Sequence, residues 1–380
     1  MKTAIVHDWF DGYAGSERVV ESFTNIWSDA DIFTLADLLT EKERRIILKS
    51  KLPKTSFIQR LPFASTKHRY YLPLFPFAIE RFDFSGYDII ISSSHSVAKG
   101  LKKNPQQLHI CYCHSPMRYA WDNAELYLKS ANISKGVKGV AARSIINYLR
   151  NWDLNTASRP DYFIANSKYI AQKIKRIYNR TADVIYPPVD INKFDCVKEK
   201  ENYFLTASRM VPYKRVDLVV EAFSKMEGKM LKVVGQGTEF EKIKSRATSN
   251  IEMLGYKDDM ELKALMQKAK AFVFAAEEDF GITVVEAMAC GTPVIALTKG
   301  GTAETVIDSK TGVLFDSQDA ESIKIAVLKF ESKNNILNPQ EISDHTKQFS
   351  REIFENNIKE YVRDKSLNFF NKEKHILNSV

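Results

Sequence analysis

The chain has 380 residues, of which 44% are hydrophobic and 27% charged, and its formal net charge is +8 at pH 7. This length exceeds what one hydrophobic core usually supports, so two domains are predicted, and the composition excludes wholesale disorder, a collagen-like repeat and a coiled coil. No apolar run reaches the roughly 18 residues of a spanning helix, and the N-terminal one is too short for a signal peptide, so we expect a cytoplasmic protein.

Strand-like and helix-like segments alternate along the first half of the chain. Strands are predicted at residues 3–7, 87–92, 108–114, 161–166 and 183–186, and a helix at 168–178. Such alternation predicts an α/β fold with a parallel sheet, which binds its ligands beyond the carboxyl ends of the strands. The polar residues expected at that edge are His7, Ser92, His114 and Asn166.

Two segments at this edge have a composition that suits a ligand site. Gly12 and Gly15 follow the first strand, and the absence of side chains there permits a substrate or a phosphate to approach the backbone. His114, Arg118 and Trp121 follow the third strand and combine an aromatic face for a sugar ring with groups that hydrogen-bond hydroxyls. Alternatively, His114 is a buried histidine with satisfied hydrogen bonds.

Positive charge is concentrated in the first half of the chain. Residues 51–194 hold 22 basic and 9 acidic side chains, and residues 60–81 interleave basic and aromatic ones. A solvated basic face, a surface for anionic lipid headgroups and a nucleic-acid-binding surface are the three interpretations. No helix-turn-helix, zinc-finger or RNP-type pattern is present, so we expect no nucleic-acid partner.

A second strand–helix series follows a stiff connector at Pro187 and Pro188, where two prolines forbid a helix. The boundary lies near residues 190–200, which gives a first domain at 1–190 and a second at 195–347. Residues 348–380 are expected to form a helical segment that crosses back onto the first domain. The predicted strands of the second domain are 203–207, 230–234, 251–254, 271–275 and 293–297, and the predicted helices are 216–226, 240–247, 261–269 and 282–289.

Residues 277–296 form the most informative motif, a loop with a tight turn at Phe280 followed by a helix and a strand. The amides of residues 281–283 begin the helix, where backbone N–H groups and the helix dipole bind phosphate. Glu286 lies inside an apolar helix, which is costly unless its carboxylate accepts hydrogen bonds, as from two ribose hydroxyls. Alternatively, Glu278 caps the helix and Glu286 is solvated.

Two further segments of the second domain suit a nucleotide ligand. Arg209 and Lys214 follow its first strand and can converge on a diphosphate, although two surface cations would look the same in sequence. Gly235 lies in a Gly-x-Gly sequence after another strand, which is weak evidence of a close backbone approach. Contacts to a nucleobase are expected near Tyr256, in a segment that does not distinguish guanine from uracil.

Together, the Glu278-x7-Glu286 spacing, Arg209 with Lys214, and the Gly15 loop resemble the retaining GT-B glycosyltransferases of family four. The resemblance covers essentially the whole chain in the right order, and the run EEDFGITVVEAMACGTPVIA is its most specific part. It implies two Rossmann-like domains with parallel sheets facing across a cleft. It also implies that the first domain binds the acceptor and that the second binds a nucleotide sugar.

The runs HSPMRYAWD and YPPVD resemble bacterial mannosyltransferases of surface-polysaccharide assembly of the O-antigen type. This resemblance implies GDP-mannose as donor. The basic, aromatic surface of the first half would then bring the protein to a lipid-linked saccharide acceptor by peripheral contact with the inner face of an anionic membrane. The family-four resemblance assigns catalysis to His114, Glu278, Arg209 and Lys214. Together with the residue patterns above, it assigns donor binding to Arg209, Lys214, Gly235, Tyr256, Glu278, Phe280, Gly281, Ile282, Thr283 and Glu286, and an acceptor or phosphate loop to Gly12, Gly15, Arg118 and Trp121.

No metal or other cofactor is expected, because the sequence has no Asp-x-Asp flanked by apolar residues and basic groups take the place of the metal. Three alternatives share this architecture. They are a glycosyltransferase that uses a UDP-sugar, a nucleotide-sugar epimerase and a non-catalytic sensor of nucleotide sugars. The spacing of the two glutamates together with the two cations argues against the epimerase.

Overall fold

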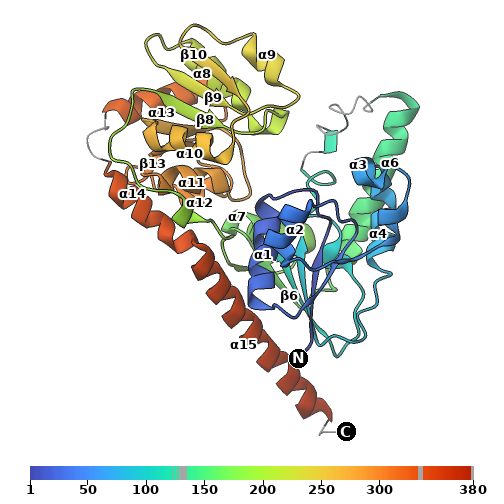
Figure 1. Ribbon diagram of the computed structural model, residues 1–380. Coiled ribbons are helices and arrows are strands. Elements are labelled where there is room, and N and C mark those ends of the chain that lie inside the picture. Colours follow the sequence, from blue (N-terminus) through green and yellow to red (C-terminus); the bar gives the residue numbers. More distant parts are fainter. Residues whose placement is uncertain (123, 126–127, 129–134, 333–336, 378–380) are drawn as a thin grey trace. The chain divides into compact units, whose positions relative to one another are not determined.

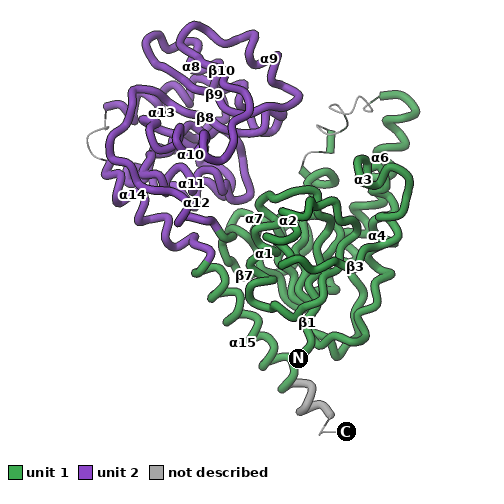
Figure 2. The backbone as a smooth tube through the Cα atoms, in the orientation of Figure 1, with its two compact units in different colours: residues 1–188, 352–380 green, residues 189–351 purple. Residues whose placement is uncertain are grey.

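The computed structural model describes residues 1–122, 124, 125, 128, 135–332 and 337–377. The chain forms two compact units (Figure 2), with residues 1–188 and 352–380 in unit 1 and residues 189–351 in unit 2. The first crossing between the units directly follows Pro187 and Pro188. The second crossing lies within a long helix, after Arg351.

Unit 1 contains a seven-stranded parallel sheet in the order β3-β2-β1-β4-β5-β6-β7. Its central strand β4 and the two neighbours β1 and β5 are buried along their whole length, because helices cover both faces of the sheet (Figure 1). The strands are β1 (Thr3–His7), β2 (Asp31–Thr34), β3 (Lys54–Thr55), β4 (Ile89–Ser94), β5 (Leu108–Cys113), β6 (Tyr162–Ala165) and β7 (Asp183–Val184).

Two of the described α-helices of unit 1 begin at a side chain that caps their first turn. Thr40 accepts a hydrogen bond from the amide of Glu43 at the start of α2, and Ser167 accepts one from Ile170 at the start of α7. The helices are α1 (Gly15–Ile26), α2 (Glu41–Leu48), α3 (Ala64–Lys67), α4 (Phe75–Ile79), α6 (Gly136–Asn155) and α7 (Lys168–Tyr178), with 3₁₀ turns η1 (Phe57–Arg60), η2 (His68–Leu74) and η3 (Ala98–Gly100).

The last helix, α15 (Arg351–Leu377), packs along unit 1 (Figure 1). Phe354 is 2% exposed, and its ring lies 6.2 Å from that of Phe23 and 5.7 Å from that of Tyr112. The helix begins three residues later than residue 348, because the 3₁₀ turn η6 (Thr346–Phe349) precedes it. The C-terminal helix is therefore part of the core of unit 1.

Unit 2 contains a six-stranded parallel sheet in the order β10-β9-β8-β11-β12-β13. Its strands are β8 (Phe204–Ala207), β9 (Leu231–Val234), β10 (Ile251–Gly255), β11 (Ala271–Phe274), β12 (Val294–Leu297) and β13 (Gly312–Phe315). Its helices are α8 (Val216–Ser224), α9 (Phe240–Lys244), α10 (Asp259–Lys268), α11 (Ile282–Ala289), α12 (Thr302–Thr305), α13 (Ala320–Ser332) and α14 (Pro339–His345), with 3₁₀ turns η4 (Ile191–Lys193) and η5 (Pro212–Lys214).

The two chain segments that lead out of unit 2 are joined to each other. The amide of Val189 donates to the carbonyl of Phe349 at 2.9 Å, and Val189 forms a β-bridge with Ser350. Next to this bridge, Arg351 Nε lies 2.7 Å from Asp190 Oδ1. Backbone pairing and an ion pair therefore hold both connections at one place.

Among the described residues, no helix has the length and hydropathy needed to cross a bilayer. The predicted strands and helices are confirmed in type and order, and their ends agree or differ by up to three residues.

Candidate functional site

The predicted donor residues of unit 2 gather at the carboxyl edge of its sheet. The register pairs Ala207 at the end of β8 with Val234 at the end of β9, and β8 also pairs with β11. Because the strands are parallel, the segments that follow them leave the sheet at one edge. This edge carries the segments that contain Arg209, Gly235 and Glu278.

Gly235 and Gly237 are required by contacts within the protein. Gly235 has φ +128°, and a Cβ atom there would lie 1.9 Å from the carbonyl oxygen of Ser208. Gly237 has φ +155°, and its Cβ atom would lie 2.3 Å from the carbonyl oxygen of Met210. The two glycines thus let the chain after β9 lie against the segment of Arg209, which positions that segment.

The two predicted site residues Lys214 and Glu278 form an ion pair between Nζ and Oε1. The side chain of Lys214 is 20% exposed and that of Glu278 12%, so the pair lies near the surface. Arg209 is exposed, and its guanidinium donates to the hydroxyl of Tyr213 at 2.7 Å. A cation and a carboxylate are therefore adjacent at the edge of the sheet, with a second cation on the same segment.

The helix α11 starts directly after Gly281, which has φ +89° and lies at its N-cap. Ile282 and Thr283 form its partly exposed first turn, where the amide hydrogens of a helix are not used within the helix. Glu286 is 8% exposed, so a carboxylate is buried in this helix as its apolar neighbours predict. Phe280 is 3% exposed and its ring packs 5.5 Å from that of Phe349, which makes it a core residue beside the site.

A pair of glycines that the sequence analysis did not single out holds the Glu278 loop. Gly300 and Gly301 follow β12, and the amide of Gly301 donates to the carbonyl of Glu278 at 2.7 Å. A Cβ atom at Gly300 would lie 2.5 Å from the same oxygen. The sequence signal that could have identified this pair is the position of two adjacent glycines shortly after the predicted strand 293–297.

Tyr256 follows β10 and is 71% exposed. Its neighbour Gly255 accepts a hydrogen bond from the amide of Gly235 at 2.7 Å. The segment of Tyr256 thus adjoins the segment of Gly235, while the ring itself is presented to solvent.

In unit 1, His114 lies at the carboxyl edge of the sheet among other buried polar groups. Its Nε2 atom is 2.8 Å from Ser93 Oγ, and its amide donates to the carbonyl of Ser94 at 2.8 Å. The same serine hydroxyl lies 3.1 Å from His7 Nδ1. Burial, with smaller contributions from neighbouring cationic groups, holds the pKa of His114 well below its usual value.

The prediction for His7 and His114 at this edge is confirmed, and that for Ser92 is wrong. Ser92 Oγ is 2.8 Å from His109 Nε2 within the sheet, and both residues are completely buried. Successive side chains of a strand point to opposite faces, so the next residue, Ser93, reaches His114 instead.

Asp8 fixes the loop that follows β4. Its two carboxylate oxygens accept four backbone hydrogen bonds of 2.6–2.9 Å from residues 95–98. Asp8 is completely buried, and it also lies 3.2 Å from the ring of His95. Neither residue could be recognised from the sequence, because only the fold brings a loop 87 residues away to Asp8.

The predicted acceptor loop of unit 1 has two separate parts. Gly12 has φ +150°, and Gly15 is the first residue of α1. Arg118 and Trp121 are partly exposed in the segment after β5. The structure thus places both parts after strands of one sheet, as the sequence predicts.

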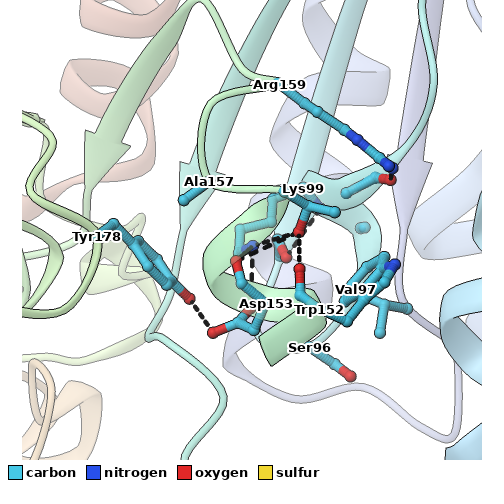
Figure 3. Close-up of polar contacts among 12 residues, drawn as sticks. Ser96, Val97, Lys99, Trp152, Asp153, Ala157, Arg159 and Tyr178 are labelled. Carbon is cyan, nitrogen blue, oxygen red and sulfur yellow. Dashed lines mark hydrogen bonds and ion pairs between the residues drawn. The ribbon is translucent and has the colours of Figure 1, made fainter. Parts of the chain in front are cut away.

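A buried ion pair holds the segment of Trp121. Lys99 Nζ lies 2.9 Å from Asp153 Oδ1, and Figure 3 shows Lys99 and Tyr178 pointing at Asp153 from two sides. Asp153 Oδ2 accepts hydrogen bonds of 2.8 Å from Tyr178 and from the indole of Trp121. Trp121 is therefore anchored by its nitrogen, and only the rest of its ring remains for a ligand.

In the part of the chain that the structure describes, no group of three or more His, Cys, Asp or Glu side chains has a geometry suited to a metal ion. Metal independence therefore stays a prediction for experiment.

Two units with parallel sheets and helices on both faces define an α/β protein of the GT-B fold. A crystal structure of the Anabaena protein HepE with UDP and glucose shares this fold, with a TM-score of 0.67, 16% identity, and coverage of 96% of this chain and 99% of that one. Residues 15–193 match the family model "Glycosyltransferase Family 4", and residues 190–350 match "Glycosyl transferases group 1". The chain therefore has the GT-B fold, and its two halves match a family-four glycosyltransferase model and a group 1 glycosyl transferase model in succession.

Two relatives illustrate the sequence similarity. An uncharacterised glycosyltransferase of Methanocaldococcus jannaschii is 33% identical over 199 residues, 51% of this chain and 55% of the relative. A GDP-mannose-dependent alpha-(1-6)-phosphatidylinositol monomannoside mannosyltransferase of Mycolicibacterium smegmatis is 32% identical over 141 residues, 32% of this chain and 36% of the relative. The matched part of the chain thus spans about half of one relative and about a third of the other.

Proposed function

We propose that the protein is a retaining glycosyltransferase that moves a hexose from a nucleotide sugar to an acceptor saccharide. The observation that carries this proposal is the Lys214–Glu278 pair next to the first turn of α11, with Glu286 buried in the same helix. Hydrogen-bond donors suited to a diphosphate and carboxylates suited to sugar hydroxyls thus occur together at a sheet edge. Such an edge is where α/β proteins bind ligands.

The chemistry follows from these groups. The bond from the anomeric carbon to the diphosphate oxygen breaks through an oxocarbenium-like state, and negative charge grows on the leaving diphosphate. The acceptor hydroxyl oxygen forms the new bond to the same carbon, and its proton passes to the leaving diphosphate. Arg209, Lys214 and the first-turn amides of α11 would stabilise that charge. Glu278 would accept hydrogen bonds from the hexose, and Glu286 from the ribose.

For the donor we propose GDP-mannose, with a UDP-sugar as the alternative. The mycobacterial relative, a GDP-mannose-dependent mannosyltransferase by name, supports the first. The HepE structure with UDP and glucose supports the second. Tyr256 is exposed beside the Gly235 segment and is a candidate to contact either base.

A thermal-shift titration tests this proposal. GDP, UDP and ADP are compared with GDP-mannose, UDP-glucose and UDP-N-acetylglucosamine, using wild type and Glu286→Gln. We expect GDP and GDP-mannose to raise the melting temperature selectively, and the variant to lose this shift. A selective shift with uridine ligands would contradict the GDP-mannose assignment, and no shift with any ligand would contradict the donor site.

Glu341→Gln is a matched control, since Glu341 lies in the first turn of α14 and its Oε1 accepts a hydrogen bond from Asn338 at 3.2 Å. This variant removes the same charge from unit 2 outside the proposed site. We expect its shift with GDP-mannose to equal that of wild type.

For the acceptor we propose a lipid-linked saccharide, reached by peripheral contact of unit 1 with an anionic membrane. Three aromatic side chains of residues 60–81 are widely exposed: Phe63 (73%), Tyr70 (76%) and Phe77 (51%). Lys67 lies within 6 Å of the first two rings, and Arg81 lies 4.4 Å from the third. Aromatic rings beside cations suit an interface with anionic headgroups.

Co-sedimentation with vesicles of phosphatidylcholine alone, or with added phosphatidylglycerol, tests this contact. We expect binding only to the anionic vesicles, weakened by salt and by a Phe63→Ser/Tyr70→Ser double variant. Equal binding to both kinds of vesicle, or binding unchanged in the variant, would contradict the proposal.

A further inference from the structure

The hydroxyl of Ser93 lies between two histidine rings. It is 3.1 Å from His7 Nδ1 and 2.8 Å from His114 Nε2. A serine hydroxyl has one hydrogen, so it can donate to only one of the two rings. The direction of these two hydrogen bonds therefore decides which nitrogen of His114 carries a proton.

The backbone fixes the direction at His7. His7 Nδ1 lies 3.1 Å from the carbonyl oxygen of Ser93 as well as from its hydroxyl. A carbonyl oxygen only accepts, so Nδ1 of His7 must carry a hydrogen. This N–H points to both oxygens of Ser93, and the serine hydrogen is left for the other ring.

The other nitrogen of His7 faces Glu17. His7 Nε2 lies 3.5 Å from Glu17 Oε1, and the two side chains are 0% and 3% exposed. Burial by itself disfavours a charged His7, but Glu17 and the more distant Asp8 outweigh it, so that the pKa of His7 is raised. Burial also disfavours a charged Glu17, yet His7 keeps the pKa of this carboxyl below its usual value.

Glu17 is itself held in place at the start of α1. Its second oxygen, Oε2, accepts from the amide of Ala14 at 3.2 Å and from the hydroxyl of Ser16 at 2.9 Å. The carboxylate therefore keeps its position beside His7. The pair favours a His7 ring with hydrogens on both nitrogens.

The Ser93 hydroxyl then donates to His114 Nε2. The environment of His114 agrees with a neutral ring, because burial, His95, His7 and Arg118 together hold its pKa well below the usual value. A neutral imidazole with Nε2 as acceptor carries its proton on Nδ1. Among the residues that the structure describes, Nδ1 of His114 has no hydrogen-bond partner.

We propose that Glu17, His7 and Ser93 are positioning residues that hold His114 as the neutral Nδ1–H tautomer, so that Nδ1 donates a hydrogen bond to an oxygen of the bound sugar. The proposal rests on the proposed function for the identity of the ligand. The tautomer itself does not depend on that function, and it is measured separately.

Nitrogen-15 NMR of the full chain, labelled at histidine, measures the tautomer at pH 7. We expect the His114 ring, assigned by its loss in His114→Gln, to show a protonated Nδ1 and an unprotonated Nε2. Ser93→Ala should shift the ring toward a mixture of tautomers, and Ser93→Thr, which keeps the hydroxyl, should restore the original signals. A wild-type ring that is charged or protonated on Nε2, or signals that are unchanged in Ser93→Ala, would overturn the proposal.

Turnover of the nucleotide sugar tests what the tautomer does. We expect Ser93→Ala to lower kcat by about tenfold, as the loss of one hydrogen bond allows, with KM for the donor nearly unchanged, and Ser93→Thr to recover most of it. A shifted tautomer with unchanged kcat would overturn the role of Nδ1. Absence of turnover in wild type would contradict the proposed function alone, since the NMR result stands without it.

Discussion

Lys214 and Glu278 form an ion pair, and a bound nucleotide sugar would contact both side chains. The cation is directed to the carboxylate, and a diphosphate brought beside it would compete for the same ammonium hydrogens. Arg209 differs, because it is exposed and its recorded side-chain hydrogen bond goes to Tyr213. Its removal therefore leaves the protein interior unchanged while taking one positive charge from the proposed site.

Replacing Arg209 by alanine should lower kcat/KM for nucleotide-sugar turnover by roughly 100- to 1,000-fold, the cost of one charge-stabilising donor. The melting temperature should stay within a degree of wild type. Steady-state release of nucleotide diphosphate measures the effect. Lys225→Ala, which removes an exposed cation paired with Glu221 on α8, should be silent, and an Arg209 variant as active as this control would contradict the prediction.

The residue types of the site could be predicted from the sequence, whereas their partners could not. Glu278, Lys214 and His114 stand out because charged and polar groups follow apolar strands. The choice between Ser92 and Ser93 depends on which face of β4 each side chain occupies, and a shift of one residue reverses it. Sequence alone does not define this register at the end of a strand that is buried on both faces.

At the scale of elements, the glycine loops set the shape of the donor edge. Gly235 combines a left-handed φ of +128° with a backbone oxygen 1.9 Å from the position of a Cβ atom. Gly228 also has a positive φ, +75°, but nothing lies within 4 Å of its Cβ position. A side chain at Gly228 would meet only the energetic cost of the positive φ, whereas one at Gly235 would also clash with the backbone.

Gly228→Ala should lower stability by about 1–2 kcal/mol, the cost of a left-handed backbone for a residue with a side chain. Gly235→Ala should cost clearly more and should also abolish the thermal shift with nucleotide, because the Ser208–Met210 segment must move. Urea unfolding of both variants measures this difference. Equal losses of stability would show that the close approach to Ser208 is not maintained in solution.

The helix α15 contributes to the core of unit 1 through one face. Phe354→Ala should cost about 3–5 kcal/mol, as for a large buried aromatic side chain, and lower the melting temperature by roughly 10 °C. Leu367→Ala is the control, because Leu367 lies on the same helix and is 56% exposed. Similar melting temperatures for the two variants would contradict the docking of this helix on unit 1.

Helix and strand types follow from the alternation of apolar segments, but several short elements do not. Residues 57–79 form α3, α4 and two 3₁₀ turns, whereas the sequence shows only interleaved aromatic and basic side chains there. Elements this short carry too few residues for a period to be visible. Their conformation is set by the packing of residues such as Phe75 and Ile79 into the core of unit 1.

At the scale of the molecule, two crossings connect the units. Pro187 and Pro188 mark the first, since two prolines exclude a helix. The second follows Arg351, the first residue of α15, three residues after the start of the predicted helical segment at residue 348. It is defined by long-range packing of Phe354, which no local pattern contains.

The Asp190–Arg351 pair ties the two crossings together and should give stability a pH dependence. Burial would raise the pKa of Asp190, but Arg351 and Lys193 lower it to about 2. The unfolded carboxyl has a pKa of about 3.9, so the stabilisation is complete above that value and is lost as the pH falls toward 2. Asp190→Asn should thus be less stable than wild type at pH 6, with a smaller difference at pH 3.

Urea unfolding of both proteins at the two pH values measures this, with Asp344→Asn as a control whose carboxylate contacts Lys347 at the surface. A difference between wild type and Asp190→Asn that is the same at pH 6 and pH 3 would show that the ion pair does not stabilise the crossings.

The central claim is transfer from a nucleotide sugar, and proton NMR of GDP-mannose during incubation with the protein tests it most directly. Even without acceptor, slow transfer to water would release GDP and free mannose, and a retaining enzyme forms the α-anomer first. The account predicts this release, its loss in Arg209→Ala, and its persistence in the presence of EDTA. Stable GDP-mannose and UDP-glucose in the presence of protein that binds them would contradict it and would favour a sensor.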